Sequence, residues 1–473
     1  MNFTKLSNVA VEERVKTALE KAKESQEKLN AVVSFVDVEE QLKNLETLDK
    51  SAPMYGMPIV LKDNVSTKGI RTTASSRILD NYVPVYDAHI VEKLKKAGAI
   101  VIAKASMDEL GMGGTNKNAY TGKVNNPWDT NRISGGSSGG SAVLVAAGIV
   151  PFAIGTDTGD SVRKPAAYNG IIGMKPTYGR ISRYGIIPYA SSLDHVGYFT
   201  TSIQDAALAL EVLAGRDDRD MTSSFKEVPT YSQHVNSDIK GKKIAVLENV
   251  QEGIKHPEMK ANFDNLVKRL QERGAIVDVV RMDDKLMHAL LPVYYIIANA
   301  EATANHSNLD GIRFGMREDG ESVEDVMINS RTKGLGSYVR KRFVIGSYSL
   351  FEENQEEIFH KAQKIRRLIV EELKNTLADY DVIMASAAPT VAPLSEASHD
   401  VSVSDEEIVA DNYMVLGNFS GYPSMSVPTG FVDGMPIGIN ITAKPFEEQT
   451  LFNIGKAIEE ETGMEGYDVE VAR

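Results

Sequence analysis

The chain has 473 residues, of which 42% are hydrophobic and 25% are charged, and it contains no cysteine. This length and composition are those of a large globular protein, and the lack of cysteine excludes disulfides, thiolate nucleophiles and cysteine-bound metal clusters. The formal net charge of −13 argues against a surface that follows a phosphate backbone, so a nucleic acid would have to be held mainly by a partner chain.

The N-terminal part of the chain predicts a helix. Glu and Lys alternate over residues 9–30, and apolar residues recur there at helical spacing. The first residues lack the apolar core of a signal peptide, and the chain has no apolar run of about 18 residues that could span a membrane. We expect a helical segment at about 5–30 in a soluble, cytoplasmic protein.

Helices and short apolar strands alternate farther along the chain. Residues 87–97 predict a helix that leads into a strand at 99–103, and residues 263–270 lead in the same way into a strand at 275–277. A capping pattern at Ser202 predicts the start of another helix. The alternation predicts an α/β fold whose sheet is covered by helices on both faces.

Two polar stretches predict long connections. Residues 217–237 and 389–408 show no regular apolar spacing. The first of them indicates a smaller lobe at about 217–330, attached to the main body.

The segment between Ile133 and Pro176 carries the strongest chemical signal. Two loops rich in Gly, Ser and Thr, at 134–141 and 155–163, flank the apolar run 142–147. Glycines let the backbone approach a ligand closely, and successive N–H groups in such turns form a concave anion site. A flexible linker is the alternative, but a linker would not lead directly into a run that must be buried. Either loop could therefore hold an oxyanion.

Short motifs narrow the chemistry without deciding it. The loops contain neither GxxxxGK[ST] nor GxGxxG, which argues against phosphate binding. Residues 135–139 match the GxSxG pattern of a serine nucleophile, but the downstream histidines form no motif that would supply its base. Lys62, which follows the apolar run 57–61, could act as the base if burial kept it neutral. A solvated lysine at the end of a strand is the alternative.

Three segments, 56–64, 135–141 and 155–165, together resemble the amidase signature family. The resemblance extends over most of the chain. It implies the amidase signature fold, with a mixed central β-sheet covered by helices on both faces, as a single domain over residues 1–473.

The family implies a triad with Ser161 as the nucleophile, Ser137 as the bridging serine and Lys62 as the base. Ser137 follows Lys62 by 75 residues and precedes Ser161 by 24, and these spacings fit the family. The bridging serine of the family follows a cis peptide, which here would be Gly136–Ser137. Neutral Lys62 would draw a proton through Ser137 from Ser161, which would then attack an amide carbonyl.

Backbone N–H groups of the loop before the nucleophile would stabilise the oxyanion, by about 3–4 kcal/mol per donor in comparable hydrolases. The loop residues that the resemblance assigns to this oxyanion hole are Asp157, Thr158, Gly159 and Asp160. The family usually has glycine where Asp160 stands. A carboxylate about 5 Å from the oxyanion would cost on the order of 3 kcal/mol at an effective dielectric constant of about 20, unless its side chain points to solvent.

Within the family, residues 173–185 and 191–194 resemble the A subunits of the glutamyl- and aspartyl-tRNA amidotransferases. That resemblance implies hydrolysis of the side-chain amide of glutamine. A guanidinium would pair with the α-carboxylate of this substrate, and a carboxylate would pair with its α-ammonium. The residues expected to contact the substrate are Ser138, Tyr294, Arg342 and Asp411.

The same resemblance implies partners. The ammonia would pass to B and C subunits that amidate Glu-tRNA(Gln) or Asp-tRNA(Asn), with tRNA, ATP and Mg²⁺ bound mainly by the partner. No cofactor and no metal ion are expected in this chain. Two alternatives stay open: a free-standing amidase that acts on small carboxamides, and a non-enzymatic amidase-like scaffold impaired by Asp160.

Overall fold

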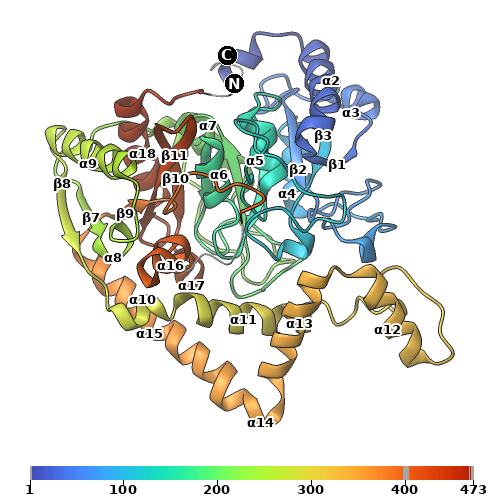
Figure 1. Cartoon of the computed structure of the whole chain (residues 1–473). Helices are drawn as coiled ribbons and strands as arrows, with labels where there is room; N and C mark the ends of the chain where they lie inside the picture. The colour runs from blue at the N-terminus through green and yellow to red at the C-terminus, as the bar shows by residue number, and fades with distance from the viewer. Residues whose placement is uncertain (1–2, 398–403, 468, 470–473) are drawn as a thin grey trace.

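A mixed sheet of 11 strands forms the centre of the computed structural model, which describes residues 3–397, 404–467 and 469 (Figure 1). From one edge to the other the strands are β1 (Val32–Phe35), β3 (Ile100–Ala105), β2 (Pro58–Lys62), β4 (Phe152–Asp157), β6 (His195–Thr200), β5 (Ile172–Lys175), β10 (Ser424–Val432), β11 (Met435–Ala443), β9 (Val382–Ser386), β7 (Lys243–Leu247) and β8 (Ile276–Val280). Strands β3, β2 and β4 run parallel, as do β9, β7 and β8, and the other neighbours are antiparallel. The mixed central sheet confirms the predicted fold class.

Strand β2 is buried on both of its faces. Ile59 and Leu61 belong to the hydrophobic core on one side of the sheet, and Val60 belongs to the core on the other side, because successive side chains of a strand point to opposite faces. This burial explains why the sequence shows an unbroken apolar run rather than alternation. By the same alternation, Lys62 lies on the face of Val60, where the Gly/Ser-rich loops and their helices pack.

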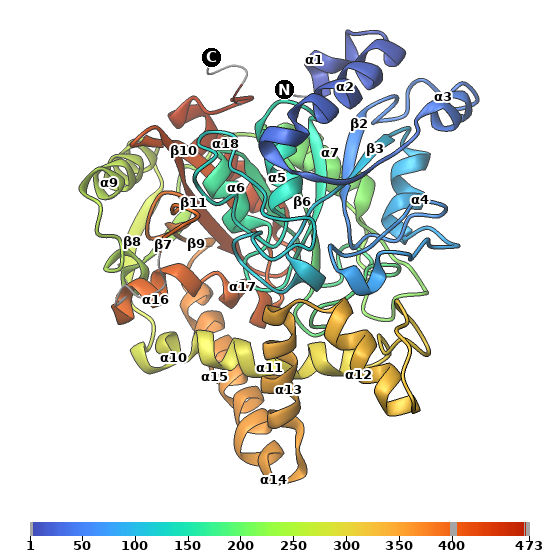
Figure 2. The same ribbon diagram turned by 45° about the vertical axis from the view of Figure 1, so that its right-hand side comes forward.

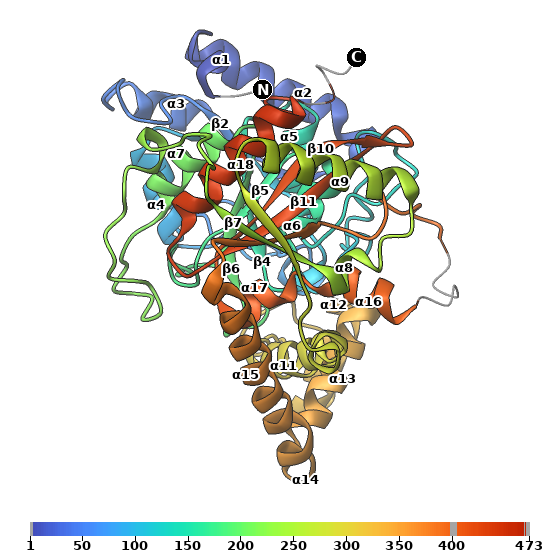
Figure 3. The same cartoon turned by 90° about the vertical axis from the view of Figure 1, so that its left-hand side faces the viewer.

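Helices cover both faces of this sheet, and Figures 2 and 3 show the layers from two further sides. The helices whose apolar residues pack with Ile59 and Leu61 are α4 (His89–Lys96), α7 (Ile203–Leu213), α9 (Pro257–Glu272) and α18 (Glu448–Thr462). Those that contribute to the cores on the opposite side include α2 (Val11–Leu29), α5 (Gly139–Ala146), α6 (Arg163–Asn169), α16 (Asp405–Asn412) and α17 (Val415–Ser420). The two Gly/Ser-rich loops lead directly into α5 and α6.

A group of helices extends beyond one end of the sheet, at the bottom of Figure 1. It comprises α10 (Asp284–His288), α11 (Leu290–Asn305), α12 (Val323–Gly334), α13 (Ser337–Leu350), α14 (Glu352–Asn354) and α15 (Lys361–Thr376). Residues 217–330 supply several of these helices and also β7 and β8, which belong to the main sheet. The division into a main body and a smaller lobe stays a prediction.

The remaining elements are short. They are the α-helices α1 (Phe3–Ser7), α3 (Glu39–Leu45) and α8 (Glu248–Gln251), the 3₁₀ turns η1 (Arg77–Leu79), η2 (Glu109–Gly111), η3 (Tyr231–Gln233) and η5 (Leu377–Asp379), and the π-helical turn η4 (Gln355–His360). None of the helices in the described ranges is both long and apolar enough to cross a membrane.

Several local predictions are confirmed. Helix α4 followed by β3 matches the pattern at 87–103, and the Ser202 hydroxyl caps α7 by accepting the N–H of Asp205 at 3.1 Å. Strand β8 forms as predicted, but it is an edge strand, and all of its residues are exposed or half-buried. The predicted loop at 389–408 is wrong at its end, because residues 405–408 begin α16, and its residues 398–403 lie outside the described residues.

Candidate active site

Lys62 lies at the carboxyl end of β2 and is fully buried. Its Nζ donates hydrogen bonds to the Oγ atoms of Ser137 and Ser138, each at 2.8 Å, and to Thr156 Oγ1 at 2.9 Å. Its hydrogen-bond partners in the described part of the chain are hydroxyl and carbonyl oxygens rather than carboxylates. The structure therefore rules out the alternative of a solvated lysine at the end of a strand.

The surroundings of Lys62 favour its neutral form. Burial lowers the pKa of Lys62 to about 7, against the opposing negative charges of Asp108, Asp157 and Asp194. A lysine with this pKa is neutral in a large fraction of molecules near pH 7. Its Nζ can then accept a proton, as a general base must.

The loop that carries Ser137 is fixed by its neighbours. The Gly136–Ser137 peptide is cis, as the family resemblance implied. Asp108 Oδ2 accepts the N–H of Asn116 at 2.9 Å, and Asn116 Oδ1 accepts the N–H of Gly139 at the start of α5, also at 2.9 Å. A Cβ atom on Gly136 would lie 2.0 Å from Asp108 Oδ2, so the close approach requires glycine. These contacts hold Ser137 beside Lys62.

Ser138 was predicted to contact the substrate, and the structure places it among the hydroxyl groups that bind Lys62 Nζ. It is fully buried, its Oγ accepts from Lys62 Nζ, and the same hydroxyl donates to the carbonyl of Thr156 at 3.0 Å. These two bonds orient Lys62 and join the serine loop to β4.

Ser161 follows β4 and is 4% exposed. Its carbonyl accepts the N–H of Ser138 at 3.2 Å, so the two serine loops are joined through their backbones. The Ser161 hydroxyl makes no hydrogen bond with any described residue. The structure therefore brings Ser161 into contact with the loop of Ser137 and Ser138 without a hydrogen bond between the two hydroxyls that the relay would use.

The loop that leads to Ser161 presents free backbone donors. The N–H groups of residues 158–161 have no acceptor among the described residues. Successive free N–H groups in a turn can stabilise an oxyanion. The φ angle of Asp160 is not in the left-handed region, so an aspartate fits this backbone without strain. The loop thus has the geometry of an anion site with an aspartate directly before Ser161.

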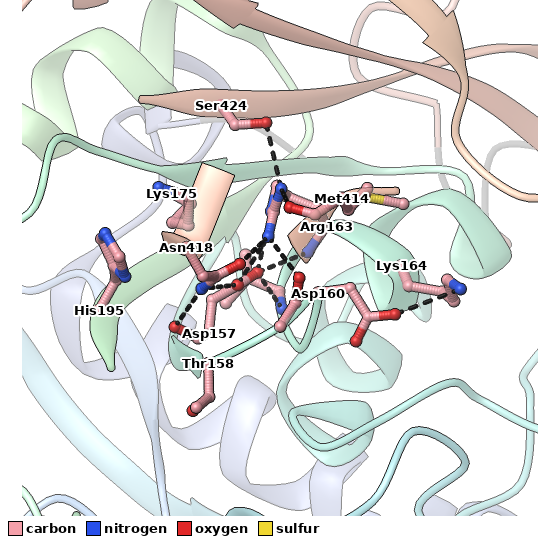
Figure 4. A network of polar contacts seen from close by, with 12 residues as sticks. Asp157, Thr158, Asp160, Arg163, Lys164, Lys175, His195, Met414, Asn418 and Ser424 are labelled. Carbon is pink, nitrogen blue, oxygen red and sulfur yellow. Dashed lines mark hydrogen bonds and ion pairs between the residues drawn. The ribbon is translucent and has the colours of Figure 1, made fainter. Parts of the chain in front are cut away.

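A buried ion pair anchors the start of this loop (Figure 4). Arg163 Nη2 lies 2.9 Å from Asp157 Oδ1, and Arg163 Nε donates to Asp157 Oδ2 at 3.1 Å. Asn418 of α17 donates to Asp157 Oδ1 at 2.9 Å and accepts from Arg163 at 2.6 Å. Burial alone would raise the pKa of Asp157, but Arg163 and Lys175 outweigh it and hold this pKa well below its usual range. The carboxylate of Asp157 is therefore ionised and committed to holding the loop.

Tyr294 and Arg342 come from the helices beyond the sheet. Tyr294, in α11, packs so closely on Gly159 that a Cβ atom there would lie 3.1 Å from the tyrosine Oη. Arg342, in α13, is 8% exposed and donates to the hydroxyls of Tyr189 at 3.1 Å and Tyr338 at 2.6 Å. No carboxylate in the described part of the chain forms an ion pair with Arg342. A buried guanidinium with neutral protein partners can bind the carboxylate of a ligand.

Lys164 links Asp411 to the loop that precedes Ser161. Lys164 Nζ lies 2.7 Å from Asp411 Oδ1 and 3.2 Å from Asp160 Oδ2. Figure 4 shows the carboxylate of Asp160 on the side of Lys164 and away from Asp157. The sequence predicted a cost for Asp160 unless its side chain points to solvent. In the structure this side chain is 22% exposed and pairs with the buried ammonium group of Lys164.

Comparison with known proteins identifies the family. The family model described as Amidase matches residues 13–452. The chain belongs to the amidase family. Curated relatives of this amidase include the A subunit of the glutamyl-tRNA(Gln) amidotransferase of Fusobacterium nucleatum, which is 42% identical over 97% of this chain and 95% of the relative. The protein of the same name from Latilactobacillus sakei is 43% identical over 88% of this chain and 85% of the relative.

Solved structures support the same family. The A subunit of the glutamyl-tRNA(Gln) amidotransferase of Thermotoga maritima is 34% identical to this amidase, with a TM-score of 0.81 over 98% of this chain and 95% of that chain. The peptide amidase of Stenotrophomonas maltophilia is 26% identical, with a TM-score of 0.82 over 96% of this chain and 94% of that chain. These matches confirm the amidase signature fold.

Several residues of the amidase site were missed by the sequence analysis. Thr156 binds Lys62, and Asp108 holds the neighbouring loop through Asn116. Arg163 and Asn418 bind Asp157. Lys164 pairs with Asp160. Arg163 and Lys164 come two and three residues after Ser161, so charge spacing could have revealed them. Asn418 gave no such signal because it comes from a segment far along the chain.

Proposed function

We propose that this amidase hydrolyses the side-chain amide of glutamine and supplies the ammonia as the A subunit of a tRNA-dependent amidotransferase. The observation that carries the proposal is the buried guanidinium of Arg342, whose protein partners are neutral. The guanidinium of Arg342 lies over the ring of Tyr295, which contacts the ring of Tyr294. Tyr294 in turn packs on Gly159, in the loop that ends at Ser161. An amide substrate with a free carboxylate fits this combination.

The reaction proposed for the triad begins with proton transfer. Neutral Lys62 takes the proton of the Ser137 hydroxyl, and Ser137 takes the proton of Ser161. The Ser161 oxygen then forms a bond to the amide carbon, and the carbonyl oxygen becomes an oxyanion that the N–H groups of residues 158–161 stabilise. The C–N bond breaks when the proton returns through Ser137 to the amide nitrogen, which leaves as ammonia. Water then attacks the acyl ester by the same relay and releases glutamate.

The proposed contacts at the other end of glutamine follow from charge. Arg342 binds the α-carboxylate, and the carboxylate of Asp411, whose side chain is 48% exposed, binds the α-ammonium. Tyr294 packs on Gly159 and is close enough to Arg342 to feel its charge, so it would border the bound glutamine.

The proposed partners follow from the relatives, which are named as subunits of a glutamyl-tRNA(Gln) amidotransferase. In a cytoplasmic complex, B and C subunits would bind the tRNA, ATP and Mg²⁺ and would use the ammonia to amidate Glu-tRNA(Gln) or Asp-tRNA(Asn). The net charge of −13 suits a subunit that leaves the tRNA to its partner.

The test is ammonia release from glutamine by the purified chain, with and without the co-expressed partner chains. We expect glutamine-dependent ammonia that increases with the complete complex. Hydrolysis of simple carboxamides without glutamine turnover would instead show a free-standing amidase. A folded protein whose Ser161 does not react with a fluorophosphonate would show a scaffold without activity.

A further inference from the structure

Three charged side chains meet beside the nucleophile. Lys164 lies in the first turn of α6, three residues after Ser161, and contacts both Asp160 and Asp411. It also donates to the backbone carbonyl of Asp411. One ammonium group thus links the loop of the proposed oxyanion hole to α16, which carries the proposed substrate contact.

The ammonium of Lys164 is held in its charged form. The side chain of Lys164 is only 6% exposed, and burial would lower its pKa, but Asp411 and Asp160 outweigh burial and hold the pKa above its usual range. A buried ammonium between two carboxylates persists because it is paired, and removal of the ammonium would leave both carboxylates uncompensated.

The two carboxylates have different exposure. The side chain of Asp160 is 22% exposed and that of Asp411 is 48% exposed, and Lys164 Nζ contacts Oδ2 of the first and Oδ1 of the second. Asp160 directly precedes Ser161, so its charge acts on any negative charge that develops on the substrate carbonyl. Asp411 is linked to Ser161 only indirectly, because it contacts Lys164 and Lys164 contacts Asp160. Loss of Lys164 should therefore affect the reaction step through Asp160 and substrate binding through Asp411.

We propose that Lys164 is a positioning residue with two separable effects: it offsets the charge of Asp160 beside the oxyanion, and it fixes Asp411 for the substrate ammonium. The proposal rests on the proposed function in that Ser161 is the nucleophile and Asp411 a substrate contact. It explains how an anion site can form in this amidase although a carboxylate directly precedes Ser161.

A double-mutant cycle separates the two effects. Lys164→Met keeps most of the length of the side chain and removes its charge. We therefore expect kcat for ammonia release to fall by about tenfold to a hundredfold and KM for glutamine to rise. In Lys164→Met with Asp160→Asn the uncompensated charge beside the oxyanion is gone, so kcat should recover most of the loss while KM stays high. A structural role for Lys164 alone would give no such recovery.

The rate of Ser161 labelling by a fluorophosphonate gives a readout that does not need glutamine. We expect labelling to slow in Lys164→Met, to recover in the double variant and to stay near the wild-type rate in Lys164→Arg. If the double variant is folded, as judged by its melting temperature, and labels as slowly as Lys164→Met, the proposal is overturned. If Lys164→Met does not fold, Lys164→Gln takes its place in the cycle. Absence of wild-type labelling would overturn the proposed nucleophile instead.

Discussion

Lys62 Nζ lies 2.8 Å from Ser137 Oγ, although the two residues are 75 positions apart. The contact depends on β2, which places Lys62 at its end, and on the loop before α5, which Asp108 and Asn116 hold in place. A buried amine hydrogen-bonded to a hydroxyl, with no carboxylate bonded to it, can exchange a proton with that hydroxyl.

Removal of the base should abolish most of the activity. Lys62→Met keeps the bulk of the side chain, so the fold should persist, and kcat should fall by about 10²- to 10⁴-fold because the general base is lost. Ser161→Ala should abolish both turnover and fluorophosphonate labelling. Both variants are measured by ammonia release, with circular dichroism as the control for folding. If the fluorophosphonate labelled Lys62→Met as fast as the wild-type protein, this result would contradict the proposed role of the lysine.

The activity should rise with pH through the pKa of Lys62, which is lowered to about 7 by burial. The base is active when neutral, so kcat/KM should increase tenfold per pH unit below about pH 7 and level off above it. The pH profile of kcat/KM at constant ionic strength measures this rising part, which we call the acid limb. A profile that stays flat between pH 5 and about pH 8 would show that another group acts as the base.

Asp108→Asn should move the acid limb of the kcat/KM profile to lower pH. The carboxylate of Asp108 is the largest of the charges that raise the pKa of Lys62, so its removal should lower that pKa further. An asparagine oxygen can still accept the N–H of Asn116, which keeps the loop in place. Asp218→Asn, at an exposed position, is the matched control and should leave the limb unchanged. A shift to higher pH would contradict the electrostatic account.

Arg342 should act on substrate binding more than on the reaction. Replacement by methionine removes a charge-assisted contact worth about 1.5–3 kcal/mol, so KM for glutamine should rise by roughly tenfold to a hundredfold with a smaller change in kcat. Arg340→Met, an exposed neighbour in α13, is the control. Hydrolysis of a small carboxamide without a carboxylate should be nearly equal in both variants. An equal loss for that substrate would indicate that Arg342 only supports the fold.

Part of the fold could be predicted from the sequence because its signals are local. The apolar run 57–61 predicts a buried strand, and Gly98 marks the passage from α4 to β3. The order of the strands could not be predicted in this way. Strands β10 and β11 come from the C-terminal part of the chain, yet they lie between β5 and β9, and such placements depend on pairings between distant segments.

The candidate site shows the same limit. Lys62 and the two serine loops could be found because each lies in a long, characteristic segment. The pairing of Asp160 with Lys164 spans only four residues, but charge spacing alone does not say that Lys164 is buried and shared with Asp411. The sequence alone therefore did not reveal the ion pair that offsets the charge of Asp160 beside Ser161.

The Asp157–Arg163 pair should be essential for stability. Both side chains are fully buried, so Arg163→Met leaves an uncompensated carboxylate and should lower the free energy of unfolding by about 3–5 kcal/mol. Arg163 holds the folded-state pKa of Asp157 below its unfolded value. The stabilisation is thus fully present above the unfolded pKa of about 4 and is lost as the pH falls through the lower folded-state value.

The measurement for this pair is the thermal midpoint at a fixed scan rate, since a protein of this size can unfold irreversibly. Arg367→Met breaks an exposed pair with Glu371, whose side chains are 81% and 50% exposed, and it should change the stability by less than about 1 kcal/mol. Arg163→Met combined with Asp157→Asn should be less destabilising than the sum of the single changes, because no unpaired charge remains buried. Additive losses would show that the two side chains stabilise the loop independently rather than as an ion pair.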